Sequence, residues 1–155
     1  MKTVARLGIA LFFAAPHVMG GCVMTPRPAY GGPMETVAVD ARTLPTSPSS
    51  IYIAPGTSAV IQANGVWSVG GPYGMFGPEG TAAAPRFEPG ALLPSAPMGA
   101  LIGSFDGTRW FPIGIGPTQV PGAGQLWLAA NDAPPAGNFT DNSGSLNVIV
   151  TRSRP

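Results

Sequence analysis

Three reactive side chains are nearly missing from this chain of 155 residues. Cysteine, histidine and lysine occur once each, as Cys22, His17 and Lys2, so residues 23–155 contain none of them. Histidine bases, cysteine nucleophiles, lysine Schiff bases and histidine-ligated zinc are therefore excluded from that region. Charged residues make up only 10% of the sequence. The polar groups that remain would coordinate a metal mostly through oxygen atoms, and oxygen ligands suit calcium better than zinc or copper.

The first 21 residues have the layout of a bacterial secretory signal peptide. A basic start is followed by an apolar run from Leu7 to Ala15, which is too short to span a bilayer. The segment VMGGC resembles a lipobox, the cleavage site of bacterial lipoproteins, with Met19 where leucine is more common. On this interpretation Cys22 is the lipidation site and anchors the protein to a membrane. The alternative is an ordinary signal peptide followed by an incidental cysteine.

Cleavage before Cys22 would leave a nearly neutral chain. It removes Lys2 and Arg6 from eight basic residues, so six arginines face seven Asp and Glu residues, a net charge of −1. Binding to nucleic acid needs a basic patch, and we therefore expect no nucleic-acid partner. Residues 22–33 are rich in Pro and Gly and predict a flexible tether. Because Val23, and not Asp, follows the cysteine, we expect the outer membrane as the location.

Residues 34–152 have the length of one domain. The sequence predicts an all-β fold for them, because 22 Gly and 19 Pro punctuate the chain and no stretch keeps a helical apolar period. The strand candidates are short and regularly spaced, which favours a β-sandwich. Residues 70–80 and 81–97 fit no regular element and are expected to form long loops.

Two connections between strand candidates are prominent. Asp106-Gly107 separates ALIGSF from TRWFPIG and predicts a two-residue hairpin turn. The segment from Asn131 to Ser145 separates QLWLAA from SLNVIV and predicts a loop between two paired strands. This loop holds two of the seven acidic residues and three of the five asparagines in the chain. Its composition is therefore unusually polar for a chain with so few charges.

Strand pairing would bring the two ends of this loop together. Asp132 lies at one end, and Asp141 and Asn142 lie at the other. Two carboxylates at close range repel each other, and a calcium ion with six to eight oxygen ligands removes that repulsion. The loop is therefore a candidate calcium site. The alternative is a solvated turn, since Asn, Asp, Gly, Pro and Ser are also common turn formers.

Several pieces of the chain, in order, resemble the PA-IL-type bacterial lectins. They are ANGVWSVGGPYGMFGPEG at 63–80, then GALIG, then ND at 131–132, and DNSGSLNVIV from Asp141 onward. The resemblance spans Met34 to about Arg152 and implies a galactose-binding-like jelly-roll, which is a β-sandwich. Members of that family are small, calcium-dependent, galactose-binding proteins. A homo-oligomer is compatible with this resemblance, because such lectins often assemble for avidity.

The resemblance also implies a set of calcium ligands. Side-chain ligands would be Asp132, Asp141 and Asn142, with Asp141 standing where the family has asparagine. Backbone carbonyl ligands would be those of Gly70 and Asn138. The loop is two residues longer than in the family, which makes Asn138 the loosest match. Two vicinal hydroxyl groups of a sugar would complete the calcium shell.

The positions that determine which sugar is bound differ from those of the family. A His and a Gln normally bind the exocyclic hydroxyl of galactose, and Ala84 and Phe87 stand in their places. Loss of those hydrogen-bonding groups lowers discrimination as well as affinity. Asp132, Asp141 and Asn142 would still contact the sugar. Phe87, or Tyr73 and Phe76 in the first loop, could stack on an apolar sugar face, although core packing is the alternative for each aromatic ring.

The sequence therefore predicts a membrane-anchored, calcium-dependent carbohydrate-binding protein that is not an enzyme. The alternative is a structural or interaction lipoprotein that keeps the sandwich and binds no sugar, which Ala84 and Phe87 favour. A glycosidase with Asp132 and Asp141 as its carboxylate pair has less support, because both are better explained as metal ligands.

Overall fold

The computed structural model describes residues 32–45, 48–83, 89–134 and 136–153. The expected signal peptide, Cys22, Ala84 and Phe87 lie outside them. Within the described residues the strands are β1 (Met34–Asp40), β2 (Tyr52–Ile53), β3 (Ala59–Ser68), β4 (Leu101–Ser104), β5 (Trp110–Pro112), β6 (Thr118–Gln119), β7 (Gly124–Gln125), β8 (Trp127–Ala130) and β9 (Ser143–Arg152). Two 3-10 helices are η1 (Gly71–Tyr73) and η2 (Ala136–Phe139). This confirms the predicted all-β class. In the same residues, no helix has the length and apolar character needed to cross a bilayer.

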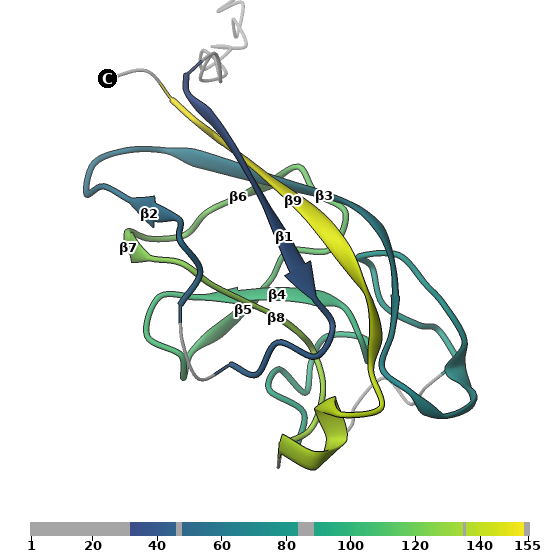
Figure 1. Cartoon of the computed structure of the whole chain (residues 1–155). Coiled ribbons are helices and arrows are strands. Elements are labelled where there is room, and N and C mark those ends of the chain that lie inside the picture. Colours follow the sequence, from purple (N-terminus) through teal and green to yellow (C-terminus); the bar gives the residue numbers. More distant parts are fainter. Residues whose placement is uncertain (1–31, 46–47, 84–88, 135, 154–155) are drawn as a thin grey trace, which may run out of the picture.

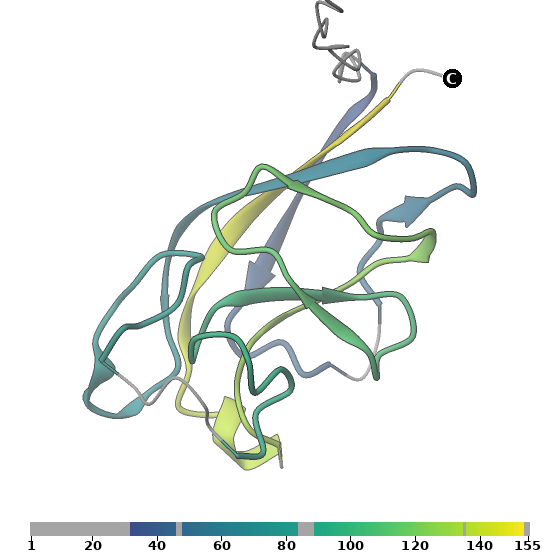
Figure 2. The ribbon, with the colours of Figure 1, turned by 180° about the vertical axis from the view of Figure 1, so that it is seen from behind.

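Two layers of antiparallel strands form the sandwich. One sheet has the order β1-β9-β3-β6 and the other has the order β5-β4-β8, while β2 and β7 pair separately. Figure 1 shows β1 and β9 in front of the layer that contains β4, β5 and β8, and Figure 2 shows the same layers from behind. The core lies between the layers, where side chains such as Ile61, Leu101 and Leu146 are fully buried.

Strand β9 is the centre of the larger sheet because it pairs with β1 on one side and with β3 on the other. Its side chains alternate between the two faces of the sheet. Leu146, Val148 and Val150 are buried, whereas Ser145 and Asn147 are exposed. An antiparallel sheet with one face on the core and one face in solvent produces this pattern.

The hairpin predicted around Asp106 is present, but its loop is longer than two residues. Ser104 pairs with Trp110, so five residues connect β4 to β5. The Asp106 Oδ1 atom accepts hydrogen bonds from the backbone N of Thr108 and Arg109, at 2.9 and 2.7 Å. The side chain thus closes a wider turn that the Asp-Gly pair alone did not reveal.

The loop after β8 does not join paired strands, and that prediction was wrong. β8 pairs with β4 in the smaller sheet, whereas β9 pairs with β1 and β3 in the larger one. The loop is therefore a crossover from one layer to the other, and η2 forms part of it (Figure 1). Its two ends still meet, because the layers pack face to face at this end of the sandwich.

Candidate functional site

Asp132 and Asn142 close the two ends of the crossover loop. The Asn142 Nδ2 atom donates hydrogen bonds to Asp132 Oδ2 at 3.1 Å and to the carbonyl oxygen of Ala41 at 3.0 Å. Ala41 follows β1, and its own N–H donates to the carbonyl oxygen of Gly144 at 3.0 Å. Asp132 and Asn142 are 5% and 3% exposed. The polar cluster is therefore a fixed part of the junction between the layers.

A surface hollow lies directly against this cluster. Its volume is about 570 Å³, within the range of small-molecule sites. The side of the hollow that belongs to the crossover loop comprises Asp132, Asn138, Thr140 and Asp141. The facing side comes from the loop after β3, with Val69, Gly71, Pro72 and Tyr73. The structure thus brings Asp132, Asn138 and Asp141 to one hollow, as the sequence led us to expect.

Gly70 lies against Asp141. A Cβ atom added to Gly70 would lie 2.1 Å from Asp141 Oδ2 and 2.3 Å from Asp141 Cγ. The residue also has φ of 74°, which L-amino acids with side chains rarely adopt. Glycine is therefore required where the loop after β3, called the first loop, meets the carboxylate of Asp141. The five predicted metal-site residues, Gly70, Asp132, Asn138, Asp141 and Asn142, all lie at this junction.

The Asn142 side chain contains an acceptor without a donor. Its Oδ1 atom is buried and accepts no hydrogen bond from any residue that the structure describes. The orientation of the amide is set by Nδ2, which faces two acceptors, Ala41 O and Asp132 Oδ2. Leaving such a group unsatisfied costs about 1–3 kcal/mol. A cation or a hydrogen-bond donor bound to Oδ1 would therefore stabilise this arrangement.

Burial raises the pKa of Asp132 above its ordinary value, and the negative charge of Asp141 raises it further. Hydrogen bonds from the Ala133 N–H and from the Asn142 amide oppose this rise. A bound cation would reverse the balance by stabilising both ionised carboxylates. Within the described residues, no three His, Cys, Asp or Glu side chains cluster, so a cation here would also need amide and backbone oxygens.

Asn131 fixes the loop on the other side of Asp132. The side chain is 1% exposed, and its Oδ1 accepts from Leu93 N at 2.9 Å. Its Nδ2 donates to the carbonyl oxygens of Leu93, Ala96 and Pro97 at 3.0–3.1 Å. The Leu92 N–H also donates to the carbonyl oxygen of Asp132. Asn131 therefore holds residues 93–97 against the chain beside the candidate ligand.

The first loop is closed by its own short pairing. Trp67 and Phe76 exchange backbone hydrogen bonds of 3.0 and 2.9 Å across it, and Trp67 is fully buried with Nε1 donating to Gly99 O. Phe76 packs against the core, whereas Tyr73 both packs there and borders the hollow.

The sequence did not predict three features of the site. They are the Ala41 carbonyl, Thr140 in the lining, and the hydrogen bonds by which Asn131 holds residues 93–97. A backbone carbonyl leaves no sequence signal, but the other two belong to the polar segment that stood out.

Comparison with known proteins supports the fold assignment. No protein-family model matches the chain, and no curated protein matches it. Among solved structures, the fold is similar to one described as "EclA N-terminal domain; PllA-like lectin". That match has a TM-score of 0.56 and 21% sequence identity, and it covers 76% of this chain and 95% of that chain. The chain thus has a lectin-like β-sandwich fold.

Proposed function

We propose that this protein is a lipid-anchored module that binds carbohydrate through a calcium ion. Asp132, Asp141 and Asn142 would supply side-chain oxygens, and Gly70 and Asn138 would supply backbone carbonyls. Vicinal hydroxyl groups of a sugar would complete the coordination shell, and no bond would be broken. The observation that carries the proposal is the buried Asn142 Oδ1 atom, which lacks a donor and belongs to a side chain bonded to Asp132.

Calcium fits the chemistry of these donors. Oxygen atoms of carboxylates, amides and backbone carbonyls are its usual ligands, at 2.3–2.6 Å. Two carboxylates match the double charge of the ion, so the ion would remove the repulsion that contributes to the raised pKa of Asp132. The same ion would give Asn142 Oδ1 a partner. When bound, calcium would hold the hydroxyl groups of the ligand and orient them at the junction.

The size of the hollow is in the range of small-molecule sites, at about 570 Å³. The similarity of the fold to a structure named a lectin agrees with a sugar in this space.

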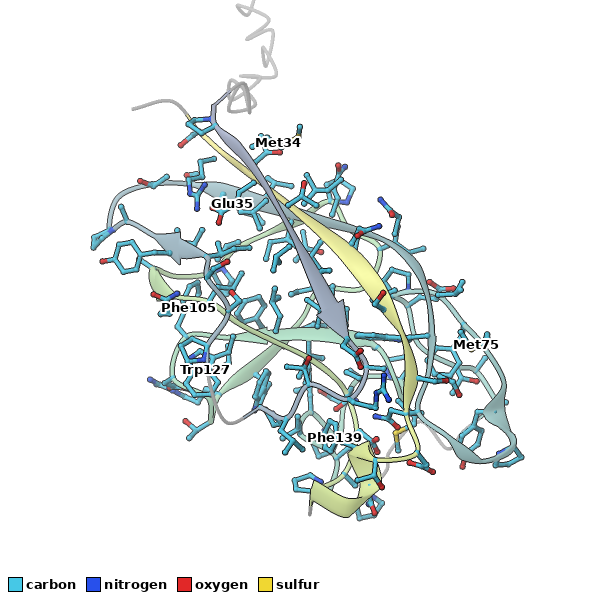
Figure 3. The ribbon with its side chains drawn as sticks, in the orientation of Figure 1. Met34, Glu35, Met75, Phe105, Trp127 and Phe139 are labelled. Carbon is cyan, nitrogen blue, oxygen red and sulfur yellow. The ribbon has the colours of Figure 1, made fainter. Side chains whose placement is uncertain are left out.

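The position of the site in the fold suits a protein that is attached at its amino terminus. β1 runs from Met34 toward Ala41, and the seven residues of a strand span about 23 Å. The crossover loop therefore lies at the other end of β1 from Met34, and Figure 3 labels Phe139 of η2 and Met34 at opposite ends of the molecule. If Cys22 is lipidated, the hollow would lie at the end of the domain opposite to the anchored terminus. The outer membrane remains the proposed location.

A structural lipoprotein is the second candidate. Ala84 and Phe87 favour it, because neither side chain can make the polar sugar contacts expected at those positions. A glycan array probed in millimolar Ca²⁺ and again in excess chelator separates the two. The proposed function requires glycans that are bound in calcium and lost in chelator. Binding that is equal in both conditions would overturn the calcium-dependent mechanism, whereas binding that is absent in both would overturn the proposed function and favour the structural role.

A further inference from the structure

The hollow has two chemically different sides. One side carries the polar groups of the crossover loop, among them the carboxylates of Asp132 and Asp141. The other side carries Val69, Pro72 and Tyr73, which are apolar or aromatic. A pyranose ring has the same two characters, with hydroxyl groups around its edge and C–H bonds across its face. Pockets that combine an apolar side with a few placed polar groups fix both the position and the orientation of a ligand.

The aromatic ring of Tyr73 is held in place before any ligand arrives. Tyr73 ends η1, and the flanking residues Gly70 and Gly74 have φ of 74° and 70°. The ring packs against the main hydrophobic core. It also lies beside Gly71, since a Cβ atom added to Gly71 would be 3.7 Å from Tyr73 Cε2. The pairing of Trp67 with Phe76 closes the loop. A ring that is already ordered binds a ligand at a lower entropic cost than a mobile one.

The charges around the hollow restrict the ligand further. Among the described residues that line the hollow there is no Arg or Lys, and two of them are carboxylates. A calcium ion would neutralise those carboxylates and leave no net positive charge for an acidic sugar. The described lining therefore offers hydroxyl recognition and an apolar ring face, and none of its residues favours a ligand carboxylate.

We propose that Tyr73 is a specificity-determining residue of the hollow, on which the apolar C–H face of a neutral pyranoside stacks. This inference rests on the proposed function, because it assumes that calcium positions the hydroxyl groups. Tyr73 adds a second contact, on the facing loop, that does not involve the metal. It should favour pyranosides that present an unbroken C–H face to the ring over those whose axial hydroxyl lies on the face that meets the ring.

The test is calorimetric titration of neutral methyl hexopyranosides and a methyl uronide in millimolar Ca²⁺. Wild type is compared with Tyr73→Ala and Tyr73→Phe, and with Tyr52→Ala as a matched control. Tyr52 is 53% exposed on β2 and does not line the hollow. We expect Tyr73→Ala to weaken binding of the best neutral pyranoside about tenfold, as for other lost aromatic contacts, while Tyr73→Phe and Tyr52→Ala bind like wild type. The uronide should bind no better than the neutral pyranosides.

Equal affinities in wild type and Tyr73→Ala would overturn the inference and leave the proposed function intact. A Tyr73→Phe variant as weak as Tyr73→Ala would also overturn it, because the hydroxyl and not the ring face would then make the contact. The effect of Ca²⁺ on the melting temperature should be the same in Tyr73→Ala as in wild type. Loss of that effect would show that Tyr73 acts through the metal site and would overturn a direct role. Absence of calcium-dependent binding in wild type would overturn the proposed function itself.

Discussion

The amide of Asn142 donates a hydrogen bond of 3.1 Å to the carboxylate of Asp132, and the two residues adjoin strands of different layers of the sandwich. Asp132 follows β8 of the smaller sheet, and Asn142 precedes β9 of the larger one. The contact is therefore a property of how the layers pack. It also places the unsatisfied Asn142 Oδ1 close to a carboxylate, which is the feature that calcium would use.

Calcium should stabilise the folded protein, because it binds the assembled junction and not the unfolded chain. A ligand at 100 times its Kd adds about 2.7 kcal/mol to the free energy of unfolding, which corresponds to roughly 5–10 °C in a domain of this size. Melting curves in millimolar Ca²⁺ and in chelator measure the shift. Asp132→Ala should abolish it. Asp106→Ala, in the β4–β5 loop, should leave it intact, and superimposed wild-type curves would contradict the metal assignment.

Gly70→Ala should disrupt the junction directly. The new methyl group would lie 2.1 Å from Asp141 Oδ2 and would force either the loop or the carboxylate to move. Gly56→Ala is the matched control, since Gly56 has φ of 79° and nothing lies within 4 Å of its added Cβ. Both variants carry a backbone cost of about 1–3 kcal/mol at positive φ. The exposed Asp141 carboxylate can turn away from the new methyl group at little cost, so calcium affinity is the readout that separates the two variants. Only Gly70→Ala should lose calcium affinity, and equal calcium affinities in the two variants would contradict the close contact.

The contribution of Asp132 to the stability of the metal-free protein should decrease as the pH rises above the ordinary pKa of this residue. Burial raises the pKa of this carboxyl in the folded state, so the native protein holds the proton at pH values where the unfolded chain has released it. The stabilising effect of that proton is fully present below 3.8, the unfolded value, and is lost as the pH rises through the folded pKa. Urea unfolding in chelator across pH 4–7 measures it, with Asp132→Asn as the variant that should remove this contribution. Wild type and variant with the same pH dependence would contradict the raised pKa.

Asn131→Ala should destabilise the fold without removing a metal ligand. The buried amide of Asn131 accepts one hydrogen bond from residues 93–97 and donates three to them, and their loss leaves several backbone groups unsatisfied. We expect the free energy of unfolding to fall by about 2–4 kcal/mol. Asn147→Ala, on the exposed face of β9, should change it by less than about 0.5 kcal/mol. Similar losses from the two variants in urea unfolding would mean that the clamp contributes little.

Part of the site could be identified from composition alone. The chain has so few acidic residues that Asp132 and Asp141 in one loop, with three asparagines, already marked a candidate site. The structure brings these residues to one junction, but through a crossover between layers, not through the strand pairing that was predicted. Strand partners depend on contacts far apart in the sequence, and QLWLAA and SLNVIV carry no local signal that assigns them to different sheets.

The sequence by itself determined the class of the fold and the chemistry available to it. Dense Gly and Pro, short apolar runs and the alternation in β9 allow strands only, and the lack of histidine, lysine and cysteine beyond Cys22 leaves oxygen ligands. Only the tertiary structure decided which oxygens meet. It buried Asn142 Oδ1 without a donor, put Gly70 against Asp141 and set Tyr73 across the hollow. These contacts depend on the packing of two sheets, in which residues about 70 positions apart become neighbours.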